Sequence, residues 1–272
     1  MKILGIESSG LTASAAIVED GILKCEFTVN NKLTHSETLL PMIREMCRIS
    51  GMDAADCDAV AVSCGPGSFT GLRIGVATAK GLALAYNIPA IRVSTLDAMG
   101  VPLSRITHSI VCPIMDARRG QTYAAAYLDG GSVVKRGAYD IYDYIGILNG
   151  LMEDGTKEFI FVGDGVPVFS GMIREKLEGK ICFAGPEYNR QRAAQVAELG
   201  ALMFKDWLLA NELTTDSLRA LGVDGVKCYG GGVMNSDELV PEYMRKSQAE
   251  RENELGLLED AGEHSLKKLR AH

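Results

Sequence analysis

The sequence contains little of what metal centres, disulfide frameworks and membrane spans require. Its seven cysteines and four histidines are dispersed, with neither a C-x-x-C nor an H-x-x-x-H pair, so neither a zinc site nor a disulfide framework is indicated. No apolar run is long enough to cross a bilayer. The apolar run at the N-terminus is too short for a signal peptide and is broken by Glu7. We therefore expect a cytoplasmic protein, with no membrane partner, whose cysteines behave as small buried hydrophobes.

Positive charge is also scarce. Lys and Arg number 28 against 35 Asp and Glu, which gives a net charge of −7. Affinity for nucleic acid depends on neutralising phosphates with basic side chains, so an acidic surface works against independent RNA binding. We expect any contact with RNA to require a partner protein.

The first half of the chain predicts three strands followed by alternating helices and strands. Asp20-Gly21 joins the second and third strands with the sequence of a type I′ hairpin. The predicted elements have the order β-β-β-α-β-α-β and lie at 3–6, 13–18, 22–29, 36–49, 59–63, 70–86 and 90–93.

The second half repeats this order of elements, although no repeat is visible residue by residue. Its elements are predicted at 109–115, 121–128, 132–137, 142–152, 159–162, 168–177 and 180–183, and a helix at 192–209 closes the unit. A duplicated unit of this order is the topology of the actin/hexokinase/Hsp70-like ATPase superfamily, whose two lobes flank a nucleotide cleft. Two unrelated α/β domains are the alternative.

We expect three parts along the chain. The first lobe would take residues 1–103. The second would take 104–212, and its last helix could pack back on the first lobe. Residues 213–272 would form a C-terminal segment that includes a glycine-rich stretch at 222–234 and ends in a charged tail.

An acidic residue ends the first strand of each half, Glu7 in one and Asp116 in the other. One carboxylate at each strand end is the minimum for a Mg²⁺–phosphate site. The candidate residues of such a cleft are Glu7, Ser8, Ser9, Gly67, Ser68, Asp116 and Arg118. However, Arg118 and Arg119 stand where glycines would admit a phosphate. The acids therefore either make polar contacts at strand ends or belong to a weak, vestigial nucleotide site.

Residues 63–75 combine a glycine- and proline-rich turn with the start of a helix, which Ser68 or Thr70 could cap. The turn could bind an anion at the helix N-terminus, but it lacks the lysine of a Walker A loop. A stripe of mostly small residues follows on the helix: Gly71, Gly75, Thr78, Ala79 and Leu82. Mid-helix glycine costs about 1 kcal/mol relative to alanine. Close helix packing would offset that cost, either within the fold or with another chain.

The preceding helix has one apolar face, formed by Leu39, Met42, Ile43 and Met46. Pro41 fits this helix if Thr38 caps it, and otherwise marks a kink. His35 is the residue to weigh as a metal ligand, but a capping or surface role fits it better because no second ligand lies at a suitable spacing.

Several segments together resemble the TsaB/YeaZ family. They are Ile3-Leu-Gly-Ile-Glu-Ser-Ser9, His35-Ser-Glu-Thr-Leu-Leu-Pro41, Gly65-Pro-Gly-Ser-Phe-Thr-Gly-Leu-Arg-Ile-Gly75, Val93-Ser-Thr-Leu96, Asp116-Ala-Arg118 with Tyr123, and Pro241-Glu-Tyr-Met-Arg245. The resemblance implies a non-catalytic, two-lobed paralogue of TsaD. TsaD transfers a threonylcarbamoyl group to N6 of the tRNA adenosine beside the anticodon.

The resemblance also implies partners. The chain would pair with TsaD and activate it, TsaE would join the complex, and the isolated chain would form a homodimer. It would meet tRNA only through the complex. We expect no tightly bound cofactor, with ATP or ADP bound only within the complex, and no metal. The helices at 36–49 and 70–86 would form the partner interface, through Leu39, Met42, Ile43, Met46, Gly71, Gly75, Thr78, Ala79 and Leu82.

Two alternatives from other classes stay open. Related proteins have been labelled glycoproteases, which suggests a metallopeptidase, although no metal-ligand spacing supports one. The superfamily also suggests a small-molecule kinase, against which the lack of phosphate-turn glycines speaks. No catalytic residue is assigned in the chain.

Overall fold

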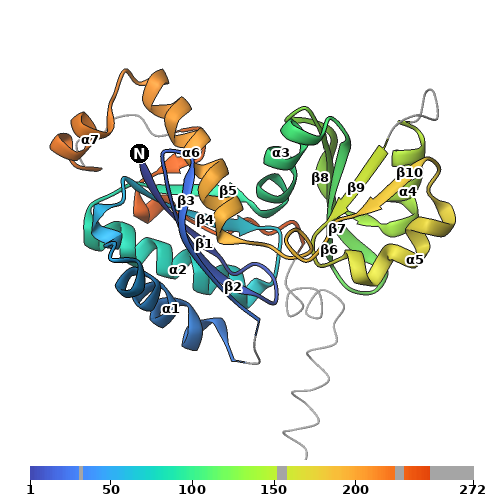
Figure 1. Ribbon diagram of the computed structural model, residues 1–272, viewed down its shortest axis with the longest axis horizontal. Helices are drawn as coiled ribbons and strands as arrows, with labels where there is room; N and C mark the ends of the chain where they lie inside the picture. Colours follow the sequence, from blue (N-terminus) through green and yellow to red (C-terminus); the bar gives the residue numbers. More distant parts are fainter. Residues whose placement is uncertain (31–32, 152–157, 224–229, 246–272) are drawn as a thin grey trace, which may run out of the picture.

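The computed structural model describes residues 1–30, 33–151, 158–223 and 230–245. Within them the chain forms two mixed β-sheets with helices on both faces of each, arranged as two lobes (Figure 1). The charged tail and residues 224–229 of the glycine-rich stretch lie outside the described residues. None of the described helices is long and apolar enough to span a membrane.

The first sheet has the strand order β11-β5-β4-β1-β2-β3. β1 lies antiparallel to β2 and parallel to β4. Asp20 and Gly21 both have positive φ, as a type I′ turn requires. The strands are Lys2–Glu7 (β1), Ala13–Glu19 (β2), Ile22–Val29 (β3), Ala59–Gly65 (β4), Ala90–Ser94 (β5) and Val233–Met234 (β11).

The second sheet has the order β10-β9-β6-β7-β8. Its strands are Ile110–Asp116 (β6), Gln121–Leu128 (β7), Gly131–Asp140 (β8), Glu158–Val162 (β9) and Lys180–Phe183 (β10). Counted within each lobe, both sheets place their five main strands in the order 5-4-1-2-3. This shared order confirms the predicted duplication and the actin-like ATPase fold.

Helices cover the first sheet from both sides. The helices α1 (His35–Ser50) and α2 (Phe69–Tyr86) pack on the face that carries Leu4 and Ile6, and α6 (Ala193–Ala210) packs on the other, which carries Ile3. This alternation along β1 follows from the two-residue period of a strand. Small residues let α6 approach closely, since a Cβ on Gly5 would overlap with Ala193 and Ala197.

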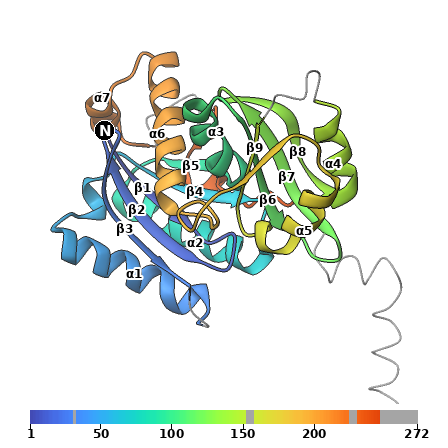
Figure 2. The same cartoon turned by 45° about the vertical axis from the view of Figure 1, so that its right-hand side comes forward.

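The second sheet is covered in the same way. The helices α4 (Ile141–Asn149) and α5 (Val166–Lys176) lie on one face, and α3 (Thr95–Thr107) lies on the other. α3 also packs against α6, which brings the two lobes together (Figures 1 and 2). The division of the chain at residue 103 stays a prediction, and α3 runs across that position.

Two helices were not predicted, α3 and the short α7 (Thr215–Leu221). α3 contains Gly100 and Pro102, which weaken its helical pattern, and it begins directly at the end of β5. The condition that would place Pro41 in the first turn of α1, a cap at Thr38, is not met. Thr34 caps this helix, and Glu37 accepts the Thr34 backbone N–H at 3.0 Å, so Pro41 lies beyond the first turn.

Candidate partner-binding groove and interlobe site

The apolar face predicted as an interface is buried inside the chain itself. The side chains of Leu39, Met42, Ile43 and Met46 on α1, and of Ala79 on α2, belong to the core between these helices and the first sheet. The chain's own first sheet thus covers these side chains, so they do not form an exposed surface in this structure. An amphipathic spacing identifies which face of a helix is apolar, but not whether the chain's own sheet or another chain covers it.

The two glycines of the small-residue stripe on α2, Gly71 and Gly75, likewise pack against the chain itself. A Cβ on Gly71 would overlap with the backbone oxygen of Ser8, and one on Gly75 with the Ser8 hydroxyl. That hydroxyl donates a hydrogen bond to the Gly71 carbonyl at 2.9 Å. Of the two uses left open for this stripe, close packing within the fold is the one that the structure shows. Thr78 donates to the Ile74 carbonyl within α2.

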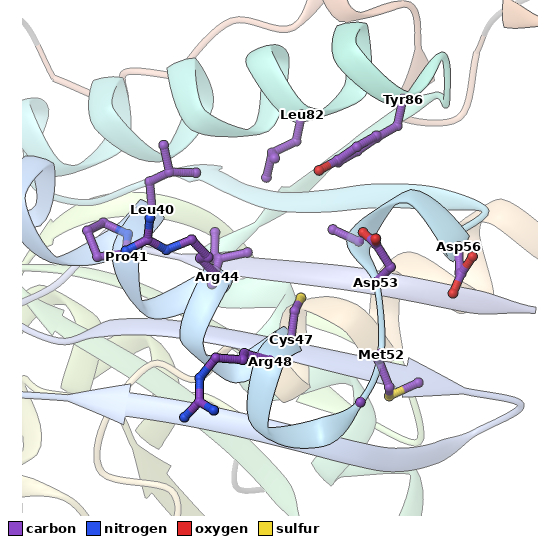
Figure 3. Close-up of a pocket in the computed structure, with 13 residues that line it drawn as sticks. Leu40, Pro41, Arg44, Cys47, Arg48, Met52, Asp53, Asp56, Leu82 and Tyr86 are labelled. Carbon is purple, nitrogen blue, oxygen red and sulfur yellow. The ribbon is translucent and has the colours of Figure 1, made fainter.

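An open groove lies on the outer side of the same two helices (Figure 3). Its volume is about 800 Å³. It runs between α1, α2 and the short 3₁₀ helix Ala54–Asp56 (η1). Its lining residues are Leu40, Pro41, Ile43, Arg44, Cys47, Arg48, Gly51, Met52, Asp53, Ala54, Asp56, Leu82 and Tyr86. Two of the predicted interface residues, Ile43 and Leu82, are in this lining. Ile43 is buried, whereas Leu82 is partly exposed to the groove.

The groove has an apolar centre and a charged rim. Leu82 and Tyr86 point from α2 towards α1, and Arg44 extends from α1 (Figure 3). Leu40 is 54% exposed, although it lies next to the fully buried Leu39. Exposed apolar side chains rimmed by polar ones are a mark of protein-binding surfaces, and tyrosine is enriched among the residues that contribute most to binding. The sequence signal that could have found them is the pair Leu39-Leu40, since one helix face cannot bury both.

A second group of predicted residues lies where the two lobes meet. Glu7 ends β1 and is only 1% exposed, and its Oε1 accepts the Ser9 backbone N–H at 2.5 Å. Burial raises the pKa of Glu7, and the nearby charge of Asp164 raises it further. Within the described residues, the other Glu7 carboxylate oxygen and the Ser9 hydroxyl have no hydrogen-bond partner.

The turn after β1 is filled by atoms of the chain. The Ser68 backbone N–H donates to the Ser9 carbonyl at 2.6 Å, and Gly67 leaves no room between itself and Ser9. A Cβ on Gly10 would overlap with the amide of Gln191. Ser68 caps α2 by accepting the Gly71 N–H, as predicted. The backbone N–H groups of Ser9 and Ser68 are therefore already hydrogen-bonded within the chain at this turn.

Asp116 is exposed and accepts the Arg118 backbone N–H at 2.7 Å. Arg118 and Arg119 both have positive φ, which non-glycine residues adopt infrequently. Burial raises the pKa of Asp164 and the nearby charge of Asp116 raises it further, just as the charge of Asp164 raises the pKa of Glu7. The sequence reasoning missed Asp164 and Gln191. Asp164 follows β9 closely, so the strand-end argument used for Glu7 could have found it.

His35 points to the backbone of the same turn. Its Nε2 lies 3.0 Å from the Gly10 carbonyl oxygen. Among the residues that the structure describes, no three His, Cys, Asp or Glu side chains are grouped so that they could hold a metal ion.

The raised pKa of Glu7 leads us to expect that the stability of the folded chain depends on pH. The pKa of Glu7 is higher in the folded state than in the unfolded state. Ionisation of Glu7 therefore lowers the free energy of unfolding as the pH rises above the pKa that this carboxyl has in the unfolded chain. Glu7→Gln keeps the acceptor for Ser9 and removes that cost. We expect its melting temperature at pH 8 to exceed that of the wild type by a few degrees, and the difference to narrow towards pH 5. The same change at the exposed Glu212 should leave the melting curve unchanged. Equal melting temperatures for Glu7→Gln and wild type at pH 8 would contradict the expectation.

Comparison with known proteins identifies the family. A family model described as TsaD, tRNA N6-adenosine threonylcarbamoyltransferase, matches residues 30–252. The chain belongs to this family. Its relatives include the tRNA threonylcarbamoyladenosine biosynthesis protein TsaB of Bacillus subtilis, 28% identical over 74% of this chain and 87% of that protein. TsaB of Escherichia coli is 38% identical over 47% of this chain, and the match spans about half of that protein, 55%.

Solved structures agree on the fold of TsaB/YeaZ proteins. YeaZ from Pseudomonas aeruginosa superposes with a TM-score of 0.63 at 20% identity, over 89% of this chain and 99% of that one. The relatives and this fold confirm the resemblance to the TsaB/YeaZ family that the motifs predicted.

Proposed function

We propose that this chain is a non-catalytic subunit of the machinery that forms threonylcarbamoyladenosine in tRNA. In this role it holds and activates a TsaD homologue. The names of its TsaB relatives support the pathway. The single structural observation that supports the mode of action is the groove between α1 and α2, which leaves Leu40 and Tyr86 exposed beside a fully packed core.

The groove suits a helix of the partner. It is bounded by two helices and offers apolar side chains between them, with Arg44 and Arg48 on one side and Asp53 and Asp56 on the other (Figure 3). An apolar stripe of a partner helix would fill the centre, and its charged flanks would meet both signs of charge at the rim. A second copy of this chain offers the same surface, which supports a homodimer when the catalytic partner is absent.

The interlobe site supports a role without chemistry of its own. The turn after β1 is occupied by Ser68 and covered by Gln191, in the place where a nucleotide-binding relative would need open backbone donors. ATP or ADP would then bind only in the complex, as would tRNA, and a TsaE homologue would join there. No feature of the described residues favours the metallopeptidase or kinase alternatives.

Reconstitution tests this function. The TsaD and TsaE homologues of the same organism are combined with tRNA, ATP, threonine and the enzyme that makes threonylcarbamoyl adenylate, with and without this chain. We expect modified adenosine, measured by mass spectrometry of digested tRNA, to fall to background without it. Full modification in its absence would refute the proposal, as would transfer by this chain without the TsaD homologue.

A further inference from the structure

The last described segment, residues 236–245, runs along α2 towards the junction of the two lobes (Figure 1). It begins with the short 3₁₀ helix Ser236–Glu238 (η3), where the Asp237 carbonyl accepts a hydrogen bond from Lys80 of α2 at 3.2 Å. Leu239 follows and is buried in the core beneath α1 and α2. This segment is thus anchored on the first lobe.

The absence of a side chain at Gly65 leaves room for the backbone of this segment. Its φ is 135°, which favours glycine, and a Cβ there would overlap with the Glu242 carbonyl oxygen. The Glu242 N–H donates to the Cys64 carbonyl at 2.7 Å. Gly65, in the turn before α2, is therefore needed for the close approach of the Glu242 backbone, which lies far away in the sequence.

Tyr243 adds a side-chain contact to α2. Its ring stacks on Phe69 with 4.6 Å between the centroids. The Arg73 guanidinium lies over the Phe69 ring, 3.9 Å from its centroid. Its Nε donates a hydrogen bond to the Tyr243 hydroxyl at 3.0 Å. Stacking and cation–π contacts of this kind each contribute modestly, but together they orient Tyr243 on the first turns of α2.

Arg245 reaches the other lobe. Its Nη1 donates to the Ala117 carbonyl at 3.0 Å, in the turn between β6 and β7. That turn also carries Asp116 and the two arginines with positive φ, Arg118 and Arg119. The hydrogen bond from Arg245 to the Ala117 carbonyl therefore connects this turn of the second lobe to a segment that packs on the first lobe through Tyr243 and Gly65.

We propose that residues 236–245 act as a clasp, closed by Arg245, that couples the position of the second lobe to helix α2. The clasp explains why the turn before α2 and the Pro241–Arg245 segment, far apart in sequence, form one structural unit. Motion of the second lobe would pull on the start of α2 through Tyr243 and Arg73. Arg245 is a positioning residue in this arrangement, and the inference does not depend on which protein α2 contacts.

Hydrogen exchange of the full-length protein tests the clasp. We compare wild type with Arg245→Ala and with Arg219→Ala as a matched control. Arg219 also donates to a backbone carbonyl, that of Asp56, and pairs in addition with Asp58, with all of these contacts inside the first lobe. In Arg245→Ala we expect exchange about tenfold faster at the Glu242 amide and in the 117–121 turn, because a charged hydrogen bond is lost. Exchange in α6 and β9 should stay at the wild-type rate, and Arg219→Ala should leave the turn unchanged.

Three results would overturn the clasp. One is unchanged exchange at both Glu242 and the 117–121 turn in Arg245→Ala. Another is an equal rise in the control. The third is a uniform rise that includes α6 and β9, since Arg245 would then stabilise the whole chain and would not couple two parts of it. Tyr243→Phe gives a second check, because losing only the hydroxyl bond to Arg73 should loosen the turn less than Arg245→Ala does.

Discussion

Leu40→Asp should weaken binding of the TsaD homologue by roughly a hundredfold, which corresponds to the loss of one central contact residue in an interface. Leu40 is 54% exposed at the groove between α1 and α2, so the folded monomer tolerates a polar side chain there. A carboxylate at this point would replace an apolar contact with a group that the partner helix must desolvate, and an ion pair with Arg44, one turn along α1, offsets only part of that cost. The dissociation constant, measured by titration calorimetry with the purified homologue, is the readout.

Leu209→Asp is the matched control for this change. Leu209 is 67% exposed on α6, which lies on the opposite face of the first sheet from α1 and α2. The chemical change and the loss of exposed apolar area are similar, but the surface is different. We expect wild-type affinity for this variant. Equal affinities for Leu40→Asp and Leu209→Asp would show that the groove is not the site of pairing.

Gly75→Leu should prevent stable folding of the chain. A Cβ on Gly75 already overlaps with the hydroxyl of Ser8, which is buried and bonded to Gly71, so a leucine cannot enter without moving α2 away from the end of β1. Forced overpacking of a close helix contact costs about 1–3 kcal/mol for a small excess of volume, and leucine adds a large one. The expected result is loss of the cooperative thermal transition or insoluble expression.

Gly81 provides the control on the same helix, since nothing lies within 4 Å of a Cβ placed there. Gly81→Ala should raise stability by about 1 kcal/mol, because it removes a mid-helix glycine without a clash. A native melting temperature for Gly75→Leu would contradict the packing described here.

Much of the fold could be predicted because its signals are local. The boundaries predicted for β3, β7 and β10 agree with the structure, and those strands have clear turn residues at their ends. Ser68 was predicted correctly as one of two candidate caps for the same reason. α3 was missed because its glycine and proline are unfavourable locally, whereas its packing between the two lobes, which stabilises it, is not a local property.

The candidate site was harder to predict, since its residues come from separate parts of the chain. Leu40 and Tyr86 belong to different helices, and their exposure depends on how α1 and α2 rest on the sheet. Gly65 and Glu242 meet only after the chain has crossed both lobes. Spacing within one segment carries no information on such contacts.

The sequence by itself determined most of the elements, the duplicated topology and the family, because periodicity, turn chemistry and contiguous motifs are all local properties of the chain. Only the tertiary structure decided which apolar and small residues face inward. Hydrophobic burial has no direction, so the same stripe on α2 suits the chain's own β1 turn or a partner equally well until the sheet and Ser8 are in place.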